Sequence, residues 1–251
     1  MNREPGVRNP ESGIQNLEFN AFSQFGQDGF QIIKSAVAEK ECDLLAAELT
    51  LLFEEQQKSA DGKIGGVRNL LRTTARVLQF ANSQKVISIL EKVADLRPFP
   101  VRAIFFDKNP DANWLVPWHQ DLAVAVAARI EAPGFTGWST KEGVLHVHPP
   151  REILEGMVTL RLHLDDCSAD NGALKVIPGS HRHGKLGAAE ISECTKSNEA
   201  VICEISKGGI LLMRPLLLHA SLSAKNPSHR RVLHLEYATQ ELPNGLKWFE
   251  N

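Results

Sequence analysis

The chain has 251 residues, with 28 Lys and Arg against 30 Asp and Glu, so its formal net charge is −2. This near-balance argues against nucleic acid as a partner, because proteins that bind a phosphate backbone usually carry a strongly basic domain or stripe. No stretch approaches the ~20 apolar residues of a membrane span, and the polar N-terminus and four scattered cysteines predict a cytoplasmic protein with reduced thiols and no membrane partner.

The first third of the chain is predicted to be mainly helical. Residues 29–33 form a short strand pattern, and Ser35 is placed to cap a helix that carries leucines at helical spacing. A second helix is predicted over roughly 83–96, where Arg97-Pro98 ends the pattern.

Beyond this point the pattern changes to short extended runs between turn residues. The predicted strands cover 101–106, 115–118, 158–164, 173–177, 210–213 and 232–237. In the third run Val and Leu alternate with Thr159, Arg161 and His163, so one face is predicted to pack on a core while the other meets polar groups. Several short strands with uneven, loop-rich connections favour a double-sheet jelly roll over βαβ units.

The predicted fold is therefore mainly β, a jelly-roll core with a helical N-terminal part packed on it. Residues 1–16 are rich in Pro, Gly, Asn and Glu without periodicity, which predicts a flexible tail. One domain is expected over 17–251, with the helical part reaching about residue 98 and the jelly roll covering about 99–240.

The segment Trp118-His119-Gln120-Asp121 is the best candidate for a metal site. Residues i and i+2 of an extended segment point the same way, so His119 and Asp121 can converge on one ion. His219 directly follows an apolar run, as expected of a ligand at a strand end. Two imidazoles and one carboxylate on one face of a metal leave open positions, which is the geometry of non-haem Fe(II) oxygenases.

Such an iron site needs a source of electrons to activate dioxygen, and 2-oxoglutarate is the usual one. The distal carboxylate of 2-oxoglutarate needs a buried cation, for which a planar and permanently charged guanidinium is suited. The chain offers Arg230 and Arg231 at the start of a predicted strand downstream of His219.

A series of motifs makes the resemblance to a known family specific. They are Trp118-His119-Gln120-Asp121, Asn171-Gly172-Ala173-Leu174, Ile177-Pro178-Gly179-Ser180-His181, His219-Ala220-Ser221 and Arg230-Arg231. In this order they resemble the phytanoyl-CoA dioxygenase (PhyH) family, and the similarity runs from about residue 30 to 237. The resemblance implies a double-stranded β-helix (cupin-like) fold that uses Fe(II), 2-oxoglutarate and O2. It also implies hydroxylation of a C–H bond in a small-molecule substrate, with conversion of 2-oxoglutarate to succinate and CO2.

The resemblance also implies roles for particular residues. The iron ligands, which are the catalytic centre, would be His119, Asp121 and His219. Contacts to 2-oxoglutarate would come from a hydroxyl two residues after the distal histidine, an arginine eleven residues after it, an apolar residue before the metal motif and an aromatic residue after it, namely Ser221, Arg230, Ile104 and Trp138.

The choice between Arg230 and Arg231 is open from the residues alone, because adjacent strand residues face opposite sides. Arg231 shares its face with Leu233 and Leu235. A simple core-face rule, by which the apolar face of a strand points into the protein, therefore favours Arg231 as the residue that reaches the pocket. The family spacing favours Arg230, and we adopt Arg230 on that ground.

Other charged residues have less specific interpretations. His146 and His148 are also spaced i, i+2, but no carboxylate follows at useful spacing, so they are predicted to be loop or lid residues. Arg161 either binds an anionic part of the substrate or forms an ion pair, and Arg68 is a second candidate for binding an anion. The segment 128–150 is predicted to be a loop that covers the site.

Two other functions stay open at this point. One is a metal-binding jelly roll without redox chemistry, and the other is a zinc hydrolase that uses the same three ligands. The hydrolase gives the arginine pair and Ser221 no obvious task. Asp121 also argues against the halogenating branch of iron chemistry, in which a small residue replaces the carboxylate. The sequence carries no indication of the oligomeric state or of the identity of the substrate.

Overall fold

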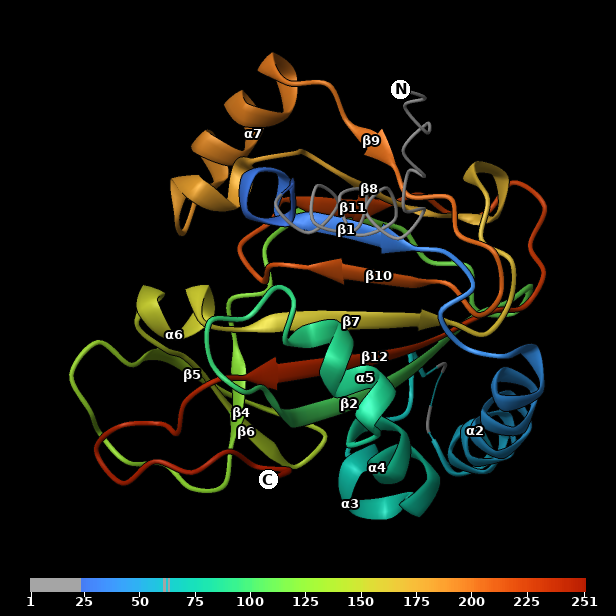
Figure 1. Cartoon of the computed structure of the whole chain (residues 1–251), viewed down its shortest axis with the longest axis horizontal. Coiled ribbons are helices and arrows are strands. Elements are labelled where there is room, and N and C mark those ends of the chain that lie inside the picture. The colour runs from blue at the N-terminus through green and yellow to red at the C-terminus, as the bar shows by residue number, and fades with distance from the viewer. Residues whose placement is uncertain (1–23, 61, 63) are drawn as a thin grey trace, which may run out of the picture.

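Two antiparallel sheets form the core of the fold in the computed structural model, which describes residues 24–60, 62 and 64–251 (Figure 1). The predicted tail over 1–16 lies outside the described residues. The larger sheet has the order β1 (Phe30–Ile33), β10 (Ile210–Met213), β7 (Val158–His163), β12 (Arg230–Ala238) and β2 (Phe99–Lys108). The smaller sheet has the order β3 (Val116–His119), β11 (His219–Ser221), β8 (Leu174–Val176) and β9 (Val201–Ile202).

The prediction of a jelly roll with packed helices is confirmed, and every strand predicted from the sequence overlaps an observed one. The run 210–213 coincides with β10, and the run 232–237 lies inside β12. All pairings within the two sheets are antiparallel. Strands that are distant in the sequence lie side by side, as β12 does between β7 and β2.

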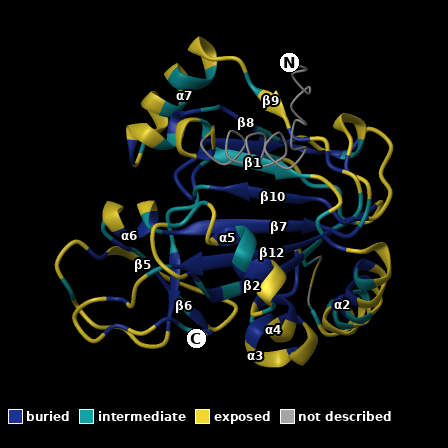
Figure 2. Cartoon of the chain, viewed as in Figure 1, coloured by how far each residue is buried: buried dark blue, intermediate teal, exposed yellow. Residues whose placement is uncertain are grey.

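Four helices gather on one side of the larger sheet and cover its outer face (Figure 1). They are α2 (Glu39–Ser59), α3 (Leu70–Thr73), α4 (Ala75–Ala81) and α5 (Gln84–Leu90). Leu160, Leu233 and Tyr237 project from the sheet into the core that these helices complete, and the Tyr237 hydroxyl donates a hydrogen bond of 2.9 Å to the Ala81 carbonyl. Exposed residues lie on the outward sides of the helices, while the central strands β10, β7 and β12 of the larger sheet are buried (Figure 2).

The helical part differs from the prediction at its boundaries. Helix α2 begins at Glu39 after Ala38, and Ser35 is not its cap, because it lies in a turn after β1 with φ of 50°. The second predicted helix ends at Leu90 rather than near residue 96, although Ser83 does cap it by accepting a hydrogen bond from the Val86 amide. Helices α3 and α4 were not predicted, because each is shorter than the window over which helical periodicity is visible.

The inner face of the larger sheet, which faces the smaller sheet, is divided into two halves. At the β1 and β10 end, Ile32, Leu211 and Met213 pack against Leu174 and Val176 of the smaller sheet and form an apolar core. Across β7, β12 and β2 the same face carries charged and polar side chains instead, among them Arg161, His234, Glu236, Arg102 and Arg230. The polar half is where the candidate site lies.

A third sheet packs beside the sandwich and corrects the prediction of a loop over 128–150. Its order is β4 (Val124–Val126), β6 (Val144–His148) and β5 (Thr136–Lys141). His146 and His148 therefore belong to a strand rather than to a lid, and His146 is fully enclosed. The remaining helices are α6 (Arg151–Glu155) and α7 (Ala188–Ser197), with single 3₁₀ turns at Ala169–Asn171 and Ser180–His183.

Within the described part of the chain, no helix combines the length and the apolar character that crossing a membrane would require.

Candidate active site

The three predicted metal ligands meet at the edge of the smaller sheet. His119 ends β3 and is paired directly with His219 at the start of β11, so the two ring centroids lie 4.1 Å apart. Asp121 follows two residues later, and its amide donates to the Pro215 carbonyl at 2.9 Å, which fixes this short segment against the chain that leads into His219. The donor atoms of all three residues lie within 4.8 Å of one another.

The hydrogen bonds of the two imidazoles show which ring atoms are available to a metal. His119 Nδ1 lies 2.8 Å from the Pro117 carbonyl, and His219 Nδ1 lies 3.0 Å from the Leu217 carbonyl. A carbonyl only accepts, so each Nδ1 carries the proton and the neutral ring keeps a lone pair on Nε2. The two Nε2 atoms face the Asp121 carboxylate at 3.8 and 3.7 Å, too far for hydrogen bonds and wide enough for an ion between them.

The protonation states of this cluster also suit a cation. Burial lowers the pKa of His219 to about 4 against the opposing effect of Asp121, so this ring is neutral at pH 7. Burial alone would raise the pKa of Asp121, but the positive charges that His219, His234 and His119 carry when protonated, together with Arg161, outweigh it and lower the pKa, so the carboxylate is ionised at neutral pH. Two neutral imidazoles and one carboxylate are a donor set that fits Fe(II).

The three residues line a cavity of about 210 Å³ that extends between the sheets to Arg230 and Ser221. Arg230 is 4% exposed, and its Nε and Nη1 are buried without a hydrogen-bond partner in the described chain. Ser221 is 2% exposed and lies two residues after His219 on β11. An enclosed guanidinium with unused donors is a site for an anion, because a buried charge is unfavourable unless it is paired.

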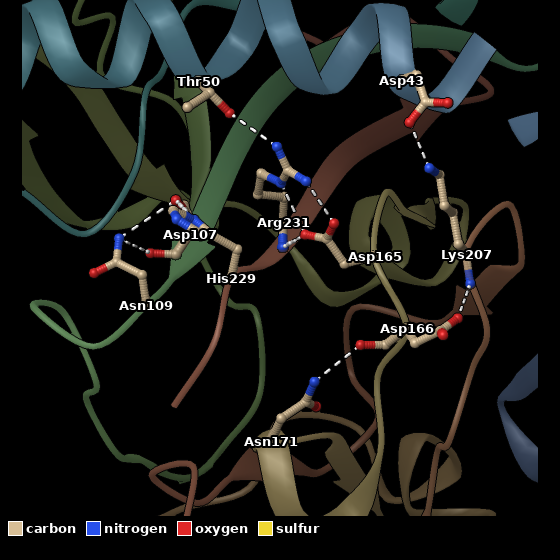
Figure 3. Close-up of polar contacts among 10 residues, drawn as sticks. All are labelled: Asp43, Thr50, Asp107, Asn109, Asp165, Asp166, Asn171, Lys207, His229 and Arg231. Carbon is tan, nitrogen blue, oxygen red and sulfur yellow. Dashed lines mark hydrogen bonds and ion pairs between the residues drawn. The ribbon is translucent and has the colours of Figure 1, made fainter. Parts of the chain in front are cut away.

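The neighbouring Arg231 lies on the opposite face of β12 and is already paired (Figure 3). Its guanidinium donates to both carboxylate oxygens of Asp165, at 2.8 and 2.6 Å, and a further hydrogen bond of 3.3 Å reaches Thr50 on α2. The core-face rule therefore describes Arg231 correctly, since this residue faces the helices, and Arg230 is the one that lines the cavity.

A ladder of polar contacts forms one wall of the cavity. Arg161 Nη1 donates to His234 Nδ1 at 2.8 Å, so His234 is neutral and carries its proton on Nε2, 3.3 Å from Glu236 Oε1. Arg102 pairs with the same carboxylate oxygen at 3.0 Å. Burial favours a neutral Glu236, but Arg102 and His234 outweigh it and lower the pKa of this carboxyl. The negative charge of Glu236 is thus compensated by Arg102, whereas Arg161 forms no ion pair with a carboxylate of the described residues and has Asp121 as its strongest attractive charge.

Three further predicted residues take different positions. Ile104 and Arg68 line the cavity, and Arg68 forms an ion pair with Glu142 in the turn between β5 and β6. Trp138 does not line it: its ring packs against the apolar cluster beside the third sheet, with the Arg129 guanidinium 5.3 Å from its centroid. Trp138 is therefore not among the residues that line the cavity, and its contact with 2-oxoglutarate stays a prediction.

Several residues of the site were not found from the sequence. They are the cavity-lining Arg102, Phe106, Trp114, Lys141, His234 and Glu236, and the buried Lys108 behind them. The available signal was alternation, since residues 102, 104, 106 and 108 of β2 share one face, as do 230, 232, 234 and 236 of β12. Recognising it required the register between these two strands, which the sequence did not provide.

A jelly roll that gathers two imidazoles and a carboxylate beside a buried cation is the arrangement that characterises mononuclear non-haem iron oxygenases. The comparisons with known proteins agree with this class. A family model described as phytanoyl-CoA dioxygenase (PhyH) matches residues 25–232. The chain belongs to the phytanoyl-CoA dioxygenase family, and thus to the Fe(II)/2-oxoglutarate-dependent oxygenase superfamily, whose cofactors are Fe(II), 2-oxoglutarate and O2.

Individual relatives are distant in sequence. Phytanoyl-CoA dioxygenase 1 of Oryza sativa subsp. japonica is 24% identical over 222 residues, covering 81% of this chain and 69% of the relative. The crystal structure of AviO1 from Streptomyces viridochromogenes Tue57 is 23% identical with a TM-score of 0.64, covering 89% of this chain and 96% of that chain. EctD from S. alaskensis with bound Fe is 16% identical with a TM-score of 0.69, covering 88% and 76%. At these identities the solved structures support the fold.

Proposed function

We propose that this protein hydroxylates a C–H bond of a small molecule, with His119, Asp121 and His219 holding Fe(II). Arg230 and Ser221 bind the distal carboxylate of 2-oxoglutarate, and Ile104 contacts its carbon chain. The observation that supports this best is that the three metal donors and the buried guanidinium of Arg230, of which two nitrogens have no hydrogen-bond partner among the described residues, line the same cavity. Fe(II) bound there supplies the activation of O2, coupled to conversion of 2-oxoglutarate to succinate and CO2.

The residues of the chain position and insulate this chemistry. The carbonyls of Pro117 and Leu217 hold the two imidazole rings with Nε2 facing Asp121. His219 and Arg230 are almost completely buried, which keeps water away from the inner part of the site. The ion pair between Arg68, which lines the cavity, and Glu142 joins the helical part of the chain to the third sheet.

The test of this proposal is whether the metal, the cosubstrate and O2 act together. Protein loaded anaerobically with Fe(II) is expected to develop a visible metal-to-ligand charge-transfer band when 2-oxoglutarate is added. After O2 is admitted it should release succinate, and labelled O2 should place one oxygen atom in the product, as mass spectrometry would show. A protein that gives neither the band nor succinate would contradict the proposal.

The same measurements separate the other two functions. Activity with Zn(II) that persists without O2 would indicate a hydrolase. A charge-transfer band without succinate, for every compound tested, would indicate a metal-binding protein without redox chemistry. The anion site formed by Arg230 and Ser221 has no task in a hydrolase, which is why we place the oxygenase first.

The electrostatics of the cavity favour an anionic substrate, with Arg161 as the residue that binds its charged group. Arg161 is 7% exposed, its buried Nε has no hydrogen-bond partner among the described residues, and its Nη1 donates to the neutral His234. Burial, and then Arg230, lower the pKa of Arg161 to about 10, so the guanidinium is still charged at neutral pH. No carboxylate of the described residues forms an ion pair with Arg161, which supports binding of a substrate anion over the alternative role of an ion pair.

A substrate screen monitored by succinate release should accordingly select carboxylates or phosphates over their neutral esters. For a substrate found in this way, Arg161→Met is expected to raise the KM by about 10- to 100-fold, the factor for a charge-assisted hydrogen bond of roughly 1.5–3 kcal/mol. The KM for 2-oxoglutarate should change much less. Selection of neutral or cationic compounds, or an Arg161→Met variant with an unchanged substrate KM, would contradict this assignment.

A further inference from the structure

Lys108, the last residue of β2, is a buried cation next to the proposed 2-oxoglutarate site. It is 1% exposed, and its ammonium Nζ lies 2.8 Å from the Leu222 carbonyl and 3.3 Å from Ser221 Oγ. The Trp114 ring covers it, with its centroid 5.5 Å from Nζ. Both acceptors are uncharged, and no ion pair of Lys108 with a carboxylate is present within the described residues.

The position of Lys108 is fixed by tight packing. Gly172 of the Asn-Gly-Ala-Leu motif has φ of +81°, and a Cβ there would lie 2.8 Å from the Leu222 carbonyl and 3.2 Å from the Lys108 ammonium. Only glycine fits this position, because the backbone conformation and the space both exclude a side chain. The motif thus closes the chain over the lysine and holds its ammonium against the Ser221 hydroxyl.

Lys108 is also directly opposite Arg230 in the register of β2 and β12. Two enclosed cations therefore lie side by side, and the guanidinium has two nitrogens without partners. The pKa of Lys108 is lowered to about 8, mainly by burial and then by repulsion from Arg230. An anion bound in the cavity at Arg230 would relieve this repulsion.

The contact with Ser221 gives the lysine a second effect. An ammonium group only donates hydrogen bonds, so Ser221 Oγ is the acceptor from Lys108. The single proton of the hydroxyl is then left to donate in another direction, and Ser221 lines the cavity that also contains the Arg230 guanidinium. A hydroxyl can otherwise either donate or accept, so the contact with Lys108 leaves Ser221 as a hydrogen-bond donor to a carboxylate.

We propose that Lys108 is a positioning residue of the 2-oxoglutarate site, which orients the Ser221 hydroxyl as a donor and adds a second positive charge behind the distal carboxylate that Arg230 binds. This inference rests on the proposed function. The inference adds to the proposed function a role for Lys108, which lies behind the cavity wall and acts on the cosubstrate through the Ser221 side chain.

The test compares two 2-oxo acids that differ at the distal end. The dissociation constants of 2-oxoglutarate and of 2-oxobutanoate, which lacks the distal carboxylate, are measured from the charge-transfer band of anaerobic Fe(II)-loaded protein. Lys108→Met is expected to weaken 2-oxoglutarate binding by about 10- to 100-fold, the factor typical of hydrogen bonds that involve a charge. Binding of 2-oxobutanoate should stay within about twofold, since it makes no contact with this end of the site.

A double-mutant cycle shows whether the lysine acts through the serine. The losses of 2-oxoglutarate affinity in Lys108→Met and Ser221→Ala should be less than additive in the double variant. Lys175→Met is the matched control, because Lys175 lies on β8 with its ammonium 5.2 Å from the Trp118 centroid and does not line the cavity. Thermal unfolding of all variants monitors their stability, and Lys108→Gln, which removes the charge but keeps a donor, replaces the methionine variant if that one does not fold.

The outcomes are distinct for the two proposals. Equal weakening of both oxo acids by Lys108→Met would show a merely structural role and overturn the inference, as would unchanged binding of 2-oxoglutarate. Wild-type protein that fails to bind 2-oxoglutarate would instead overturn the proposed function.

Discussion

Alanine in place of His119 or Asp121 is expected to abolish formation of succinate from 2-oxoglutarate. Each substitution removes one of the three donors, whose atoms lie within 4.8 Å of one another, and two donors alone hold the metal less tightly. A bound metal contributes several kcal/mol to the reactions it supports, so the rate should fall roughly a thousandfold or more. Iron content after gel filtration and succinate release, measured on the same samples, test this expectation.

His183→Ala serves as the matched control for these variants. His183 is an exposed histidine in the second 3₁₀ turn and lies outside the cavity, so its replacement should leave both iron content and turnover unchanged. Succinate release that survives in His119→Ala and Asp121→Ala at the level of the control would disprove the assignment of the metal site.

Arg230→Leu and Arg231→Leu are expected to have opposite consequences although the residues are adjacent. Arg230→Leu removes the buried partner of the distal carboxylate and should raise the KM for 2-oxoglutarate by about 100-fold or more, since breaking a buried charge pair costs roughly 3–5 kcal/mol. Arg231→Leu should leave this KM nearly unchanged and lower the melting temperature instead. The reason is the loss of the bidentate pair with Asp165, a half-buried contact that joins β12 to the loop after β7.

Steady-state kinetics over a range of 2-oxoglutarate concentrations, together with thermal unfolding, separate the two variants. Each variant serves as the control for the other, because both substitutions remove one guanidinium group from β12. A 2-oxoglutarate KM that rises in Arg231→Leu and not in Arg230→Leu would reverse our choice between the two arginines.

Much of the β core could be predicted from local patterns. Alternation in 158–164 and the apolar run 210–213 define β7 and β10, because the period of two is a property of each strand by itself. The convergence of His119 and Asp121 followed from the same period. The helix boundaries were less predictable: α2 begins four residues after Ser35, since the chain first completes a turn behind β1.

The remainder of the site depends on pairings between distant segments. Lys108 lies beside Arg230, and Arg102 beside Glu236, only because β2 and β12 pair in one particular register. No local signal contains that information, so these residues were not predicted. The position of Trp138 depends on pairing in the same way: its spacing from the metal motif suggested a place in the cavity, but the hairpin of β5 and β6 packs the ring in the neighbouring apolar cluster.

The division of the inner sheet face into an apolar and a polar half has a thermodynamic consequence. Lys108, Arg161 and Arg230 form a group of enclosed positive charges without carboxylate partners in the described chain, and such a group lowers the free energy of unfolding. Anions that bind there favour the folded chain by mass action. The same cations thus favour ligand binding and reduce the stability of the ligand-free protein. The leucine-rich packing on the helical side of the sheet has to offset this loss of stability.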